Sequence, residues 1–406
     1  MTDSSSNKIL SHLDEMYIEF EKKTKLNKKK YMHDVLELTK QNFIKNKIVL
    51  YGGTAMNMYL DDKSKFYTVC DIPDYDGYIL NAQKTSLNFA KQLKEKKYNY
   101  ILLKKAFHKN TFKLSWEFND IADFTDISEE DYRMLVKKSS LIDGFLVAPL
   151  SLIKSNAYIE LCLPLSSMFR WNKIYTRILI LEKNTKELSV SKTKLKYEAS
   201  TLSDSLNAII TQIVKLIIDN NIPFVGIKAI RYFLGHDIWK HETIGKFAYV
   251  SCMTLSDSDF HQRIEDLLSI QNIPFESKTS PATSFILEKT TYCVTIKRKR
   301  IKLLSIHKTK TQCFSFIQVK QKQTEFSVIS VFYLISILYF YQFVFASKAN
   351  SKLDEQNAIM IRGLSKLITS KKMYSETCLG SNVSKESILK NRLKMGENPI
   401  LFSHTQ

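Results

Sequence analysis

The stretch IVLYGGTAMNMYL, residues 48–60, sets two adjacent glycines between a short apolar run and an amphipathic segment. The chain has only 10 glycines in 406 residues, so their pairing at one point needs a reason. Glycine lacks a Cβ atom, and the backbone can therefore turn sharply and approach another group closely. The pattern predicts a short strand over residues 48–51, a turn at Gly52 and Gly53, and a helix from Thr54.

A strand-to-helix turn of this kind can bind a phosphate, because free backbone N–H groups and the positive end of a helix face the anion. The G-x-G-x-x-G motif of dinucleotide folds and the G-x-x-x-x-G-K-[ST] motif of P-loops are both absent from the sequence. Taken alone, the glycine pair favours a structural turn over a phosphate site.

Acidic residues downstream favour the second interpretation. The segment DIPDYDGYIL carries Asp74 and Asp76 on a predicted strand, where alternate side chains share a face. Two carboxylates held together repel each other unless a cation lies between them, and Mg²⁺ prefers such oxygen ligands. Asp123 lies in an apolar strand context, IADF, where a charge is costly without a partner. An exposed strand end with unrelated acids is the alternative for Asp74 and Asp76.

The chain carries a formal net charge of +19, which indicates a polyanionic partner, nucleic acid before membrane. An AT-rich genome would also enrich the sequence in lysine, so part of the charge has a second explanation. The residues at 22–30 are predicted to form a basic turn between two helices. The basic stretches are candidates for steering RNA or are solvated surface, and they lie at residues 22–30, 94–97, 104–105 and 297–302.

Residues 326–346 carry no charge over a length that could span a bilayer. Their many aromatic residues, together with Ser330, Ser336 and Gln342, favour a central buried helix, and a membrane anchor is the alternative. The six cysteines contain no C-x-x-C pair, so we expect buried thiols in a reducing compartment rather than disulfides or a zinc site. The polar N-terminal stretch is not expected to act as a signal peptide.

An internal repeat is visible between two halves of the chain. Residues 222–234, IPFVGIKAIRYFL, follow the pattern of residues 48–60, with Gly226 in the place of Gly52. The repeat indicates two copies of one fold, and chance similarity of two strand–turn–helix units is the alternative. The alternation of helices and strands predicts a sheet covered by helices in an α/β or α+β module.

The downstream acids of the second copy are Asp257 and Asp259, which we align with Asp74 and Asp76. The segment that should supply the third acid, VTIKRKRIKLL, is basic instead. We therefore expect the second copy to be non-catalytic.

The sequence resembles the DNA-polymerase-β-like nucleotidyltransferases, and among them the poly(A) polymerase catalytic subunits of large cytoplasmic DNA viruses of the giant-virus, asfarvirus and poxvirus type. The resemblance rests on LYGGTAMNMYL, DIPDYDGY, HKNTFKLSWEFNDIADFTDI and APLSLIKSNAYIELCLPLSSMFRWNKIYTRILIL. It is close over residues 35–185 and loose elsewhere. It implies an α+β fold, in which a nucleotidyltransferase-like sheet flanked by helices precedes a second, degenerate nucleotidyltransferase-like copy and C-terminal helices.

With this resemblance, the predicted organisation has four segments. They are an N-terminal helical segment at 1–46, a catalytic nucleotidyltransferase domain at 47–190, a degenerate nucleotidyltransferase-like domain at 191–320, and a C-terminal helical region with a partly disordered tail at 321–406.

The resemblance also implies an activity: template-independent transfer of AMP from ATP to the 3′-hydroxyl of RNA, with release of pyrophosphate. The catalytic carboxylates would hold two Mg²⁺ (or Mn²⁺) ions, and they are Asp74, Asp76 and Asp123. The implied nucleotide-binding residues are Gly52, Gly53, Thr54, Asn57, Arg170 and Lys173. The partner would be an RNA 3′ end, with a homodimer or a processivity subunit besides; no membrane attachment is expected. The place of action would be the host cytoplasm or the virion.

Two other functions fit the same motifs. One is another nucleotidyltransferase that adds U or CCA, or that modifies a protein or a small molecule. The other is a non-catalytic RNA-binding scaffold that keeps the fold, which the three aspartates argue against.

Overall fold

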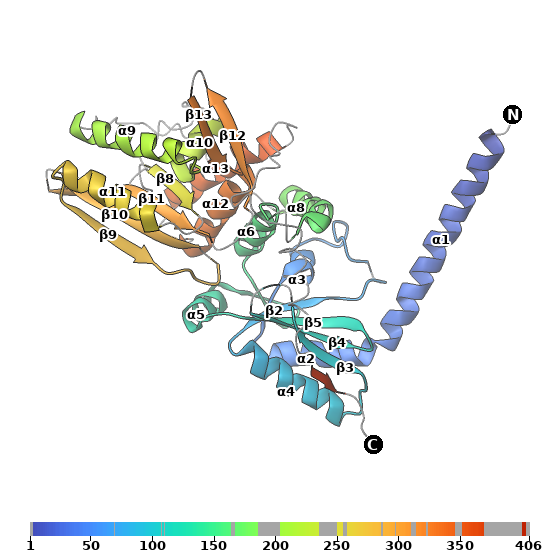
Figure 1. Ribbon diagram of the computed structural model, residues 1–406. Helices are drawn as coiled ribbons and strands as arrows, with labels where there is room; N and C mark the ends of the chain where they lie inside the picture. Colours follow the sequence, from blue (N-terminus) through green and yellow to red (C-terminus); the bar gives the residue numbers. More distant parts are fainter. Residues whose placement is uncertain are drawn as a thin grey trace. The chain divides into compact units, whose positions relative to one another are not determined.

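A computed structural model of the chain divides by its contacts into two compact units (Figure 1). The first unit is Met1–Ile153 with Leu389–Gln406, and the second is Lys154–Ile388. The boundaries of these two units differ from those of the four segments predicted from the sequence, and the four segments stay a prediction. The structure describes residues 3–68, 70–106, 108, 110–163, 167–185, 204–234, 250–254, 258–285, 287–296, 298–309, 314–321, 324–345, 351–368 and 400–402.

The first unit is built on an eight-stranded mixed sheet in the order β14-β3-β4-β5-β2-β1-β7-β6. Its central pair, β2 and β5, is parallel, while β1 pairs with β2 antiparallel and with β7 parallel. The strands are β1 (Val49–Tyr51), β2 (Tyr75–Ile79), β3 (Ile101–Lys105), β4 (Thr111–Trp116), β5 (Asn119–Asp126), β6 (Ser140–Ile142), β7 (Phe145–Val147) and β14 (Ile400–Phe402).

Two helices, α2 (His33–Lys45) and α4 (Ala82–Glu95), cover one face of this sheet (Figure 1). Phe43 of α2 and Phe89 of α4 both contact the ring of Phe124 on β5, at centroid distances of 5.6 and 6.5 Å. Because successive strand residues point to opposite faces, Asp123 must point away from these helices. The other helices of this unit are α1 (Asp3–Tyr31), α3 (Gly52–Met58) and α5 (Glu129–Lys138), and α6 (Leu150–Glu160) crosses the boundary between the units.

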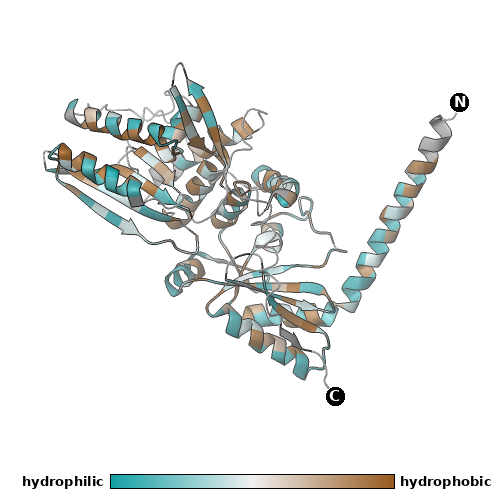
Figure 2. Ribbon diagram, viewed as in Figure 1, coloured by the Kyte–Doolittle hydropathy of each residue, from teal (hydrophilic) through white to brown (hydrophobic). Residues whose placement is uncertain are grey.

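Helix α1 runs without a break through residues 22–30, so the predicted basic turn is wrong. The stretch contains neither Gly nor Pro, and its lysines in the last turn complement the negative end of the helix dipole. The helix ends where Tyr31 stacks on Trp116, with 5.2 Å between ring centroids. Hydrophilic and hydrophobic residues alternate along the coloured part of α1 (Figure 2), and apolar side chains such as Leu13 and Phe20 are exposed.

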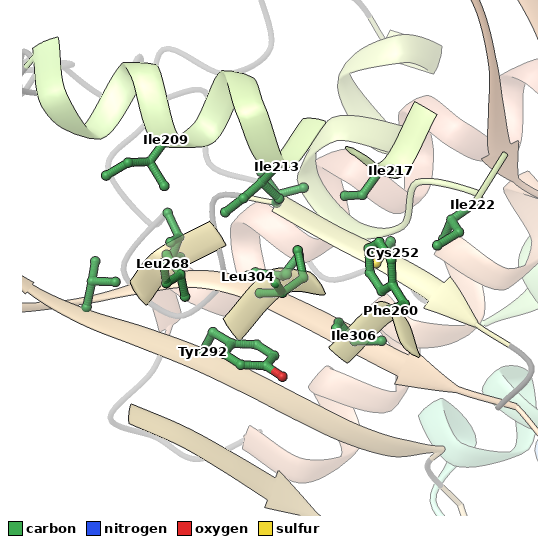
Figure 3. Packing of buried hydrophobic residues seen from close by; sticks show 14 of the residues in the cluster. Ile209, Ile213, Ile217, Ile222, Cys252, Phe260, Leu268, Tyr292, Leu304 and Ile306 are labelled. Carbon is green, nitrogen blue, oxygen red and sulfur yellow. The ribbon is translucent and has the colours of Figure 1, made fainter. Parts of the chain in front are cut away.

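The second unit contains a four-stranded sheet in the order β8-β11-β10-β9 and a β12-β13 hairpin. One face of the sheet is closed by apolar side chains of α9 and α11. Figure 3 shows Ile209, Ile213 and Ile217 of α9 pointing toward the sheet residues Cys252 and Leu304. The strands are β8 (Val250–Thr254), β9 (Phe275–Ser280), β10 (Glu288–Ile296), β11 (Lys299–Lys308), β12 (Phe316–Gln321) and β13 (Thr324–Ile329). The helical elements are η1 (Met168–Arg170), α8 (Trp171–Asn184), α9 (Asp204–Asp219), α10 (Gly226–Leu234), α11 (Ser258–Ile270), α12 (Val331–Phe345) and α13 (Ser351–Ile368).

The second unit repeats the strand order of the first. Phe224 bridges to Cys252 in an antiparallel sense and to Val328 in a parallel sense, as β1 does with β2 and β7. The order β9-β10-β11-β8, then Phe224, then β13-β12 thus matches β3-β4-β5-β2-β1-β7-β6. Gly52 and Gly226 both have positive φ, +71° and +60°, at the start of the following helix. The chain therefore has the predicted α+β fold with a second nucleotidyltransferase-like copy.

The predicted alignment of Asp257 and Asp259 with Asp74 and Asp76 is wrong for Asp259. It lies in the first turn of α11, after the strand, whereas the strand pairing puts Ser251 in the place of Asp76. Asp257 lies outside the described residues, as do the cysteines Cys313 and Cys378 and most of the predicted disordered tail.

The apolar stretch 326–346 is divided between two elements. Its first residues belong to β13, and the helix α12 begins only at Val331, after Ser330. Eleven of the 15 side chains of α12 are buried, which confirms the prediction of a central buried helix. Among the helices that the structure describes, none combines the length and the apolar character that a membrane span requires.

Candidate active site

Four side chains lie in a row across four neighbouring strands of the first unit. Tyr51 of β1 is the register partner of Asp76 on β2, which is the partner of Asp123 on β5, which is the partner of Lys113 on β4. Residues that are directly opposite on neighbouring strands point to the same face of a sheet. The row therefore faces away from α2 and α4, and the structure brings Asp76 and Asp123 side by side.

The diglycine turn lies directly against this row. A Cβ atom at Gly52 would lie 2.0 Å from the Oδ2 atom of Asp76, and the φ of Gly52, +71°, is one that other residues rarely adopt. Both facts require glycine at this position. The carboxylate of Asp76 thus touches the backbone at the start of α3, where the glycine pair was predicted to meet a phosphate.

Asp74, two residues before Asp76, is held by the helix that follows the glycines. The hydroxyl of Thr54 donates a hydrogen bond to the carbonyl oxygen of Asp74, at 2.6 Å. The side chain of Asn57 accepts from the backbone N–H groups of Phe66 and Tyr67, at 3.0 and 3.1 Å. Both polar side chains of α3 therefore fix the segment that leads to the carboxylates.

Lys113 is a site residue that the sequence analysis missed. Its Nζ atom lies 3.0 Å from Asp123 and 3.2 Å from Asp120. Burial lowers the pKa of Lys113, but the charges of Asp123, Asp74 and Asp120 outweigh it and raise the pKa overall. A lysine between apolar residues in the strand TFKLSW was the available signal, since a buried ammonium needs an anionic neighbour.

Asp123 is nearly buried, and burial raises the pKa of its carboxyl to about 6 against the opposing charge of Lys113. The neighbouring charge of Asp74 contributes to this raised pKa. At neutral pH the group is ionised, and Lys113 supplies its counter-charge. The site therefore holds its negative charge at a cost that a bound cation would reduce.

We expect Asp123→Asn to remove a pH-dependent loss of stability in metal-free protein. A carboxyl with a folded-state pKa of about 6 contributes stability that is fully present below its ordinary value of 3.8 and is lost as the pH rises through about 6. Urea unfolding in EDTA should therefore show the parent losing about 1–3 kcal/mol relative to Asp123→Asn between pH 4 and 7. Asp120→Asn, a more exposed acid of the same strand, serves as the control. Parallel curves for the parent and Asp123→Asn would contradict the raised pKa.

The other two predicted nucleotide-binding residues belong to the second unit. Arg170 ends the short helix η1, with its guanidinium 3.8 Å from the Glu160 carboxylate. Lys173 is exposed on α8. Their predicted role stays a prediction.

The donor set fits a hard divalent cation, since the carboxylates of Asp76 and Asp123 lie side by side next to a bare glycine backbone and the charge of Asp74 acts on Asp123. As they stand, no three His, Cys, Asp or Glu side chains of the described residues are grouped closely enough to hold a metal ion. The ammonium of Lys113 occupies the position of counter-ion to Asp123.

A mixed sheet whose first strand ends in a diglycine turn, with Asp76 and Asp123 side by side on the next two strands, defines the class of this protein as a nucleotidyltransferase. Residues 37–167 match the family described as "Poly(A) polymerase catalytic subunit". The match includes the diglycine turn and all three aspartates.

A similarity in fold extends over the whole chain. The crystal structure of the Megavirus polyadenylate synthase superposes with a TM-score of 0.75 at 17% sequence identity, covering 99% of this chain and 86% of that one. At this identity the likeness establishes the fold. A search of curated protein sequences finds no match.

Proposed function

We propose that the protein is a template-independent poly(A) polymerase that transfers AMP from ATP to the 3′-hydroxyl of RNA and releases pyrophosphate. The observation that carries the proposal is the pairing of Asp76 with Asp123 on adjacent strands, with Asp76 against the backbone of Gly52. Carboxylates and a turn whose backbone N–H groups would bind a phosphate therefore lie within contact of each other. The match of residues 37–167 to the poly(A) polymerase family supports adenylate as the transferred group.

In the proposed reaction Asp74, Asp76 and Asp123 would hold two Mg²⁺ or Mn²⁺ ions. When bound, such ions would lower the barrier by stabilising the attacking and leaving oxygens of an in-line displacement. The carboxylates suit these ions because Mg²⁺ and Mn²⁺ both prefer oxygen ligands. Lys113 pairs with Asp123 in the row.

The chain's own residues would contribute positioning. Gly52 and Gly53 would offer backbone N–H groups to the triphosphate of ATP, while Thr54 keeps Asp74 in place through its carbonyl oxygen. Lys113 would keep Asp123 ionised and aligned on the face where the RNA 3′-hydroxyl must arrive. Such positioning accounts for much of the acceleration in phosphoryl-type transfers.

RNA would be attracted by the positive charge of the chain. The exposed lysines of α1 within residues 22–30 would supply part of this charge in the first unit. Arg170 and Lys173 of the second unit are further candidates for phosphate contacts. A homodimer or a processivity subunit, and action in the host cytoplasm or the virion, remain part of the proposal.

The proposal is tested by incubating the purified protein with an RNA primer, Mg²⁺ and each of the four NTPs separately. We expect long tails with ATP and short or no extension with UTP, CTP or GTP. Preferential incorporation of UTP or CTP would contradict adenylation and favour another nucleotidyltransferase reaction. Absence of transfer from every NTP, with the RNA still bound, would favour the scaffold.

A further inference from the structure

The second copy carries hydroxyl groups where the first copy carries its row of charges. Ser251 on β8 is the register partner of Ser305 on β11, which is the partner of Thr291 on β10. By strand pairing, these three residues correspond to Asp76, Asp123 and Lys113. Ser251 also lies against the glycine of its own copy, since a Cβ atom at Gly226 would lie 3.1 Å from the Oγ atom of Ser251. The frame of the site is thus retained without its carboxylates.

A cavity of about 60 Å³ opens over this row of hydroxyls. It is bounded on the sheet side by the row and by Gly226, and on the other side by Leu334 and Tyr341 of α12. A single water needs about 10–15 Å³ on the same measure, so the cavity has room for a group of a few heavy atoms, about the size of a phosphate.

The charged residues that line this cavity are all basic. They are Lys289 and Lys302; His307 also lines the cavity, and the described lining contains no Asp or Glu. The adjacent Glu288 pairs with Lys308, at 3.5 Å, and Lys289 forms no ion pair with any residue that the structure describes. Burial, and then the charge of Lys302, lowers the pKa of Lys289, so the two ammonium groups repel each other across the cavity. An anion between them would remove that repulsion.

His307 adds a donor that has no protein acceptor. It is 7% exposed, it is the register partner of Lys289, and its ring makes no hydrogen bond within the described residues. Burial, and then the charge of Lys289, lowers the pKa of His307 to about 3, so the ring is neutral and offers one N–H group. His307 lines the cavity, where a bound ligand would accept a hydrogen bond from this N–H group.

We propose that this cavity binds a terminal phosphate group, of a free nucleotide, of pyrophosphate or of an RNA end. Lys289 and Lys302 supply the charge, while His307, Ser251 and Ser305 supply hydrogen bonds. The loss of the acids has changed a site for cations and triphosphate into a site that binds an anion directly. This site does not depend on the reaction proposed for the first copy.

The test measures binding of pyrophosphate to the full chain by titration calorimetry in EDTA. Without divalent cations the carboxylates of the first copy repel the anion, so binding there is suppressed. We expect Lys289→Met and Ser251→Asp each to weaken binding about 10-fold or more, because each removes or opposes a charge-assisted contact. Lys215→Met is the matched control, since it makes the same charge change on an exposed position of α9, across the sheet.

No binding by the parent at millimolar pyrophosphate would overturn the proposal, and so would equal weakening by Lys289→Met and Lys215→Met. The parent's thermal midpoint, compared with that of each variant, separates lost binding from lost folding. A short oligoadenylate with a 5′-phosphate, compared with its 5′-hydroxyl form and with ATP, identifies the source. Tighter binding of the 5′-phosphorylated form assigns an RNA end, and tighter binding of ATP assigns a nucleotide.

Discussion

Asp76→Asn is expected to reduce nucleotide transfer at least about 100-fold in kcat while the protein stays folded. The substitution keeps the size of the side chain and removes the charge that is central in the row, between Tyr51 and Asp123. Incorporation of labelled ATP into an RNA primer measures the loss, and thermal unfolding checks the fold. Asp74→Asn should act in the same direction, because Asp74 contributes the neighbouring charge.

Asp120→Asn is the matched control for this prediction. Asp120 lies on the same strand as Asp123 and accepts a hydrogen bond from Ser115, at 2.7 Å, but it is not a member of the row. It also contacts Lys113, so it reports on general loss of negative charge near the site. We expect its activity to stay within about 3-fold of the parent. Full activity in Asp76→Asn, or equal losses in both variants, would contradict the assignment of this row of residues to the active site.

Gly52→Ala is expected to reduce transfer at least about 10-fold and to lower the free energy of unfolding by about 1–3 kcal/mol. Two effects combine at this position. The alanine must adopt a φ of +71°, and its Cβ atom would lie 2.0 Å from Asp76 Oδ2, so the carboxylate has to move. The transfer assay and urea unfolding measure the two effects separately.

Gly144→Ala separates the backbone strain from the collision. Gly144 has a φ of +85°, and its added Cβ atom would meet only the side chain of Ile44, at 3.2 Å. We expect a stability loss of about 1 kcal/mol with transfer retained. If Gly144→Ala lost as much activity as Gly52→Ala, the loss would reflect destabilisation, and the contact between Gly52 and Asp76 would have no special role.

The local pattern predicted the turn because the turn depends on residues close in sequence. Asp74, which the sequence placed on the strand with Asp76, lies just before β2, and its pairing with Asp76 stays a prediction. A short strand, two glycines and a helix occur where the spacing indicated, although α3 begins at Gly52 itself rather than at Thr54. The side-by-side position of Asp76 and Asp123 depends on the register between β2 and β5, which distant residues decide. For the same reason Lys113 was missed, and Asp259 was aligned with the wrong element.

Elsewhere, local composition was misleading. The lysines of residues 22–30 suggested a turn, yet lysine is a good helix former and α1 continues through them. The uncharged stretch 326–346 was predicted to be one helix, because hydropathy alone does not distinguish a strand from a helix. The structure changes from strand to helix at Ser330. The strand order of the two copies became clear only from the pairing of strands.

The position of β14 has a consequence for synthesis. Its residues pair with β3 at the edge of the first unit's sheet, although they come from the far end of the chain. Because ribosomes add about 5–20 residues per second, β14 is synthesised on the order of tens of seconds after β3. During that time the open side of β3 could pair with the same strand of another nascent chain on the polysome. Lys104 and Lys105 lie on β3, and their mutual repulsion between chains is a safeguard against such co-assembly.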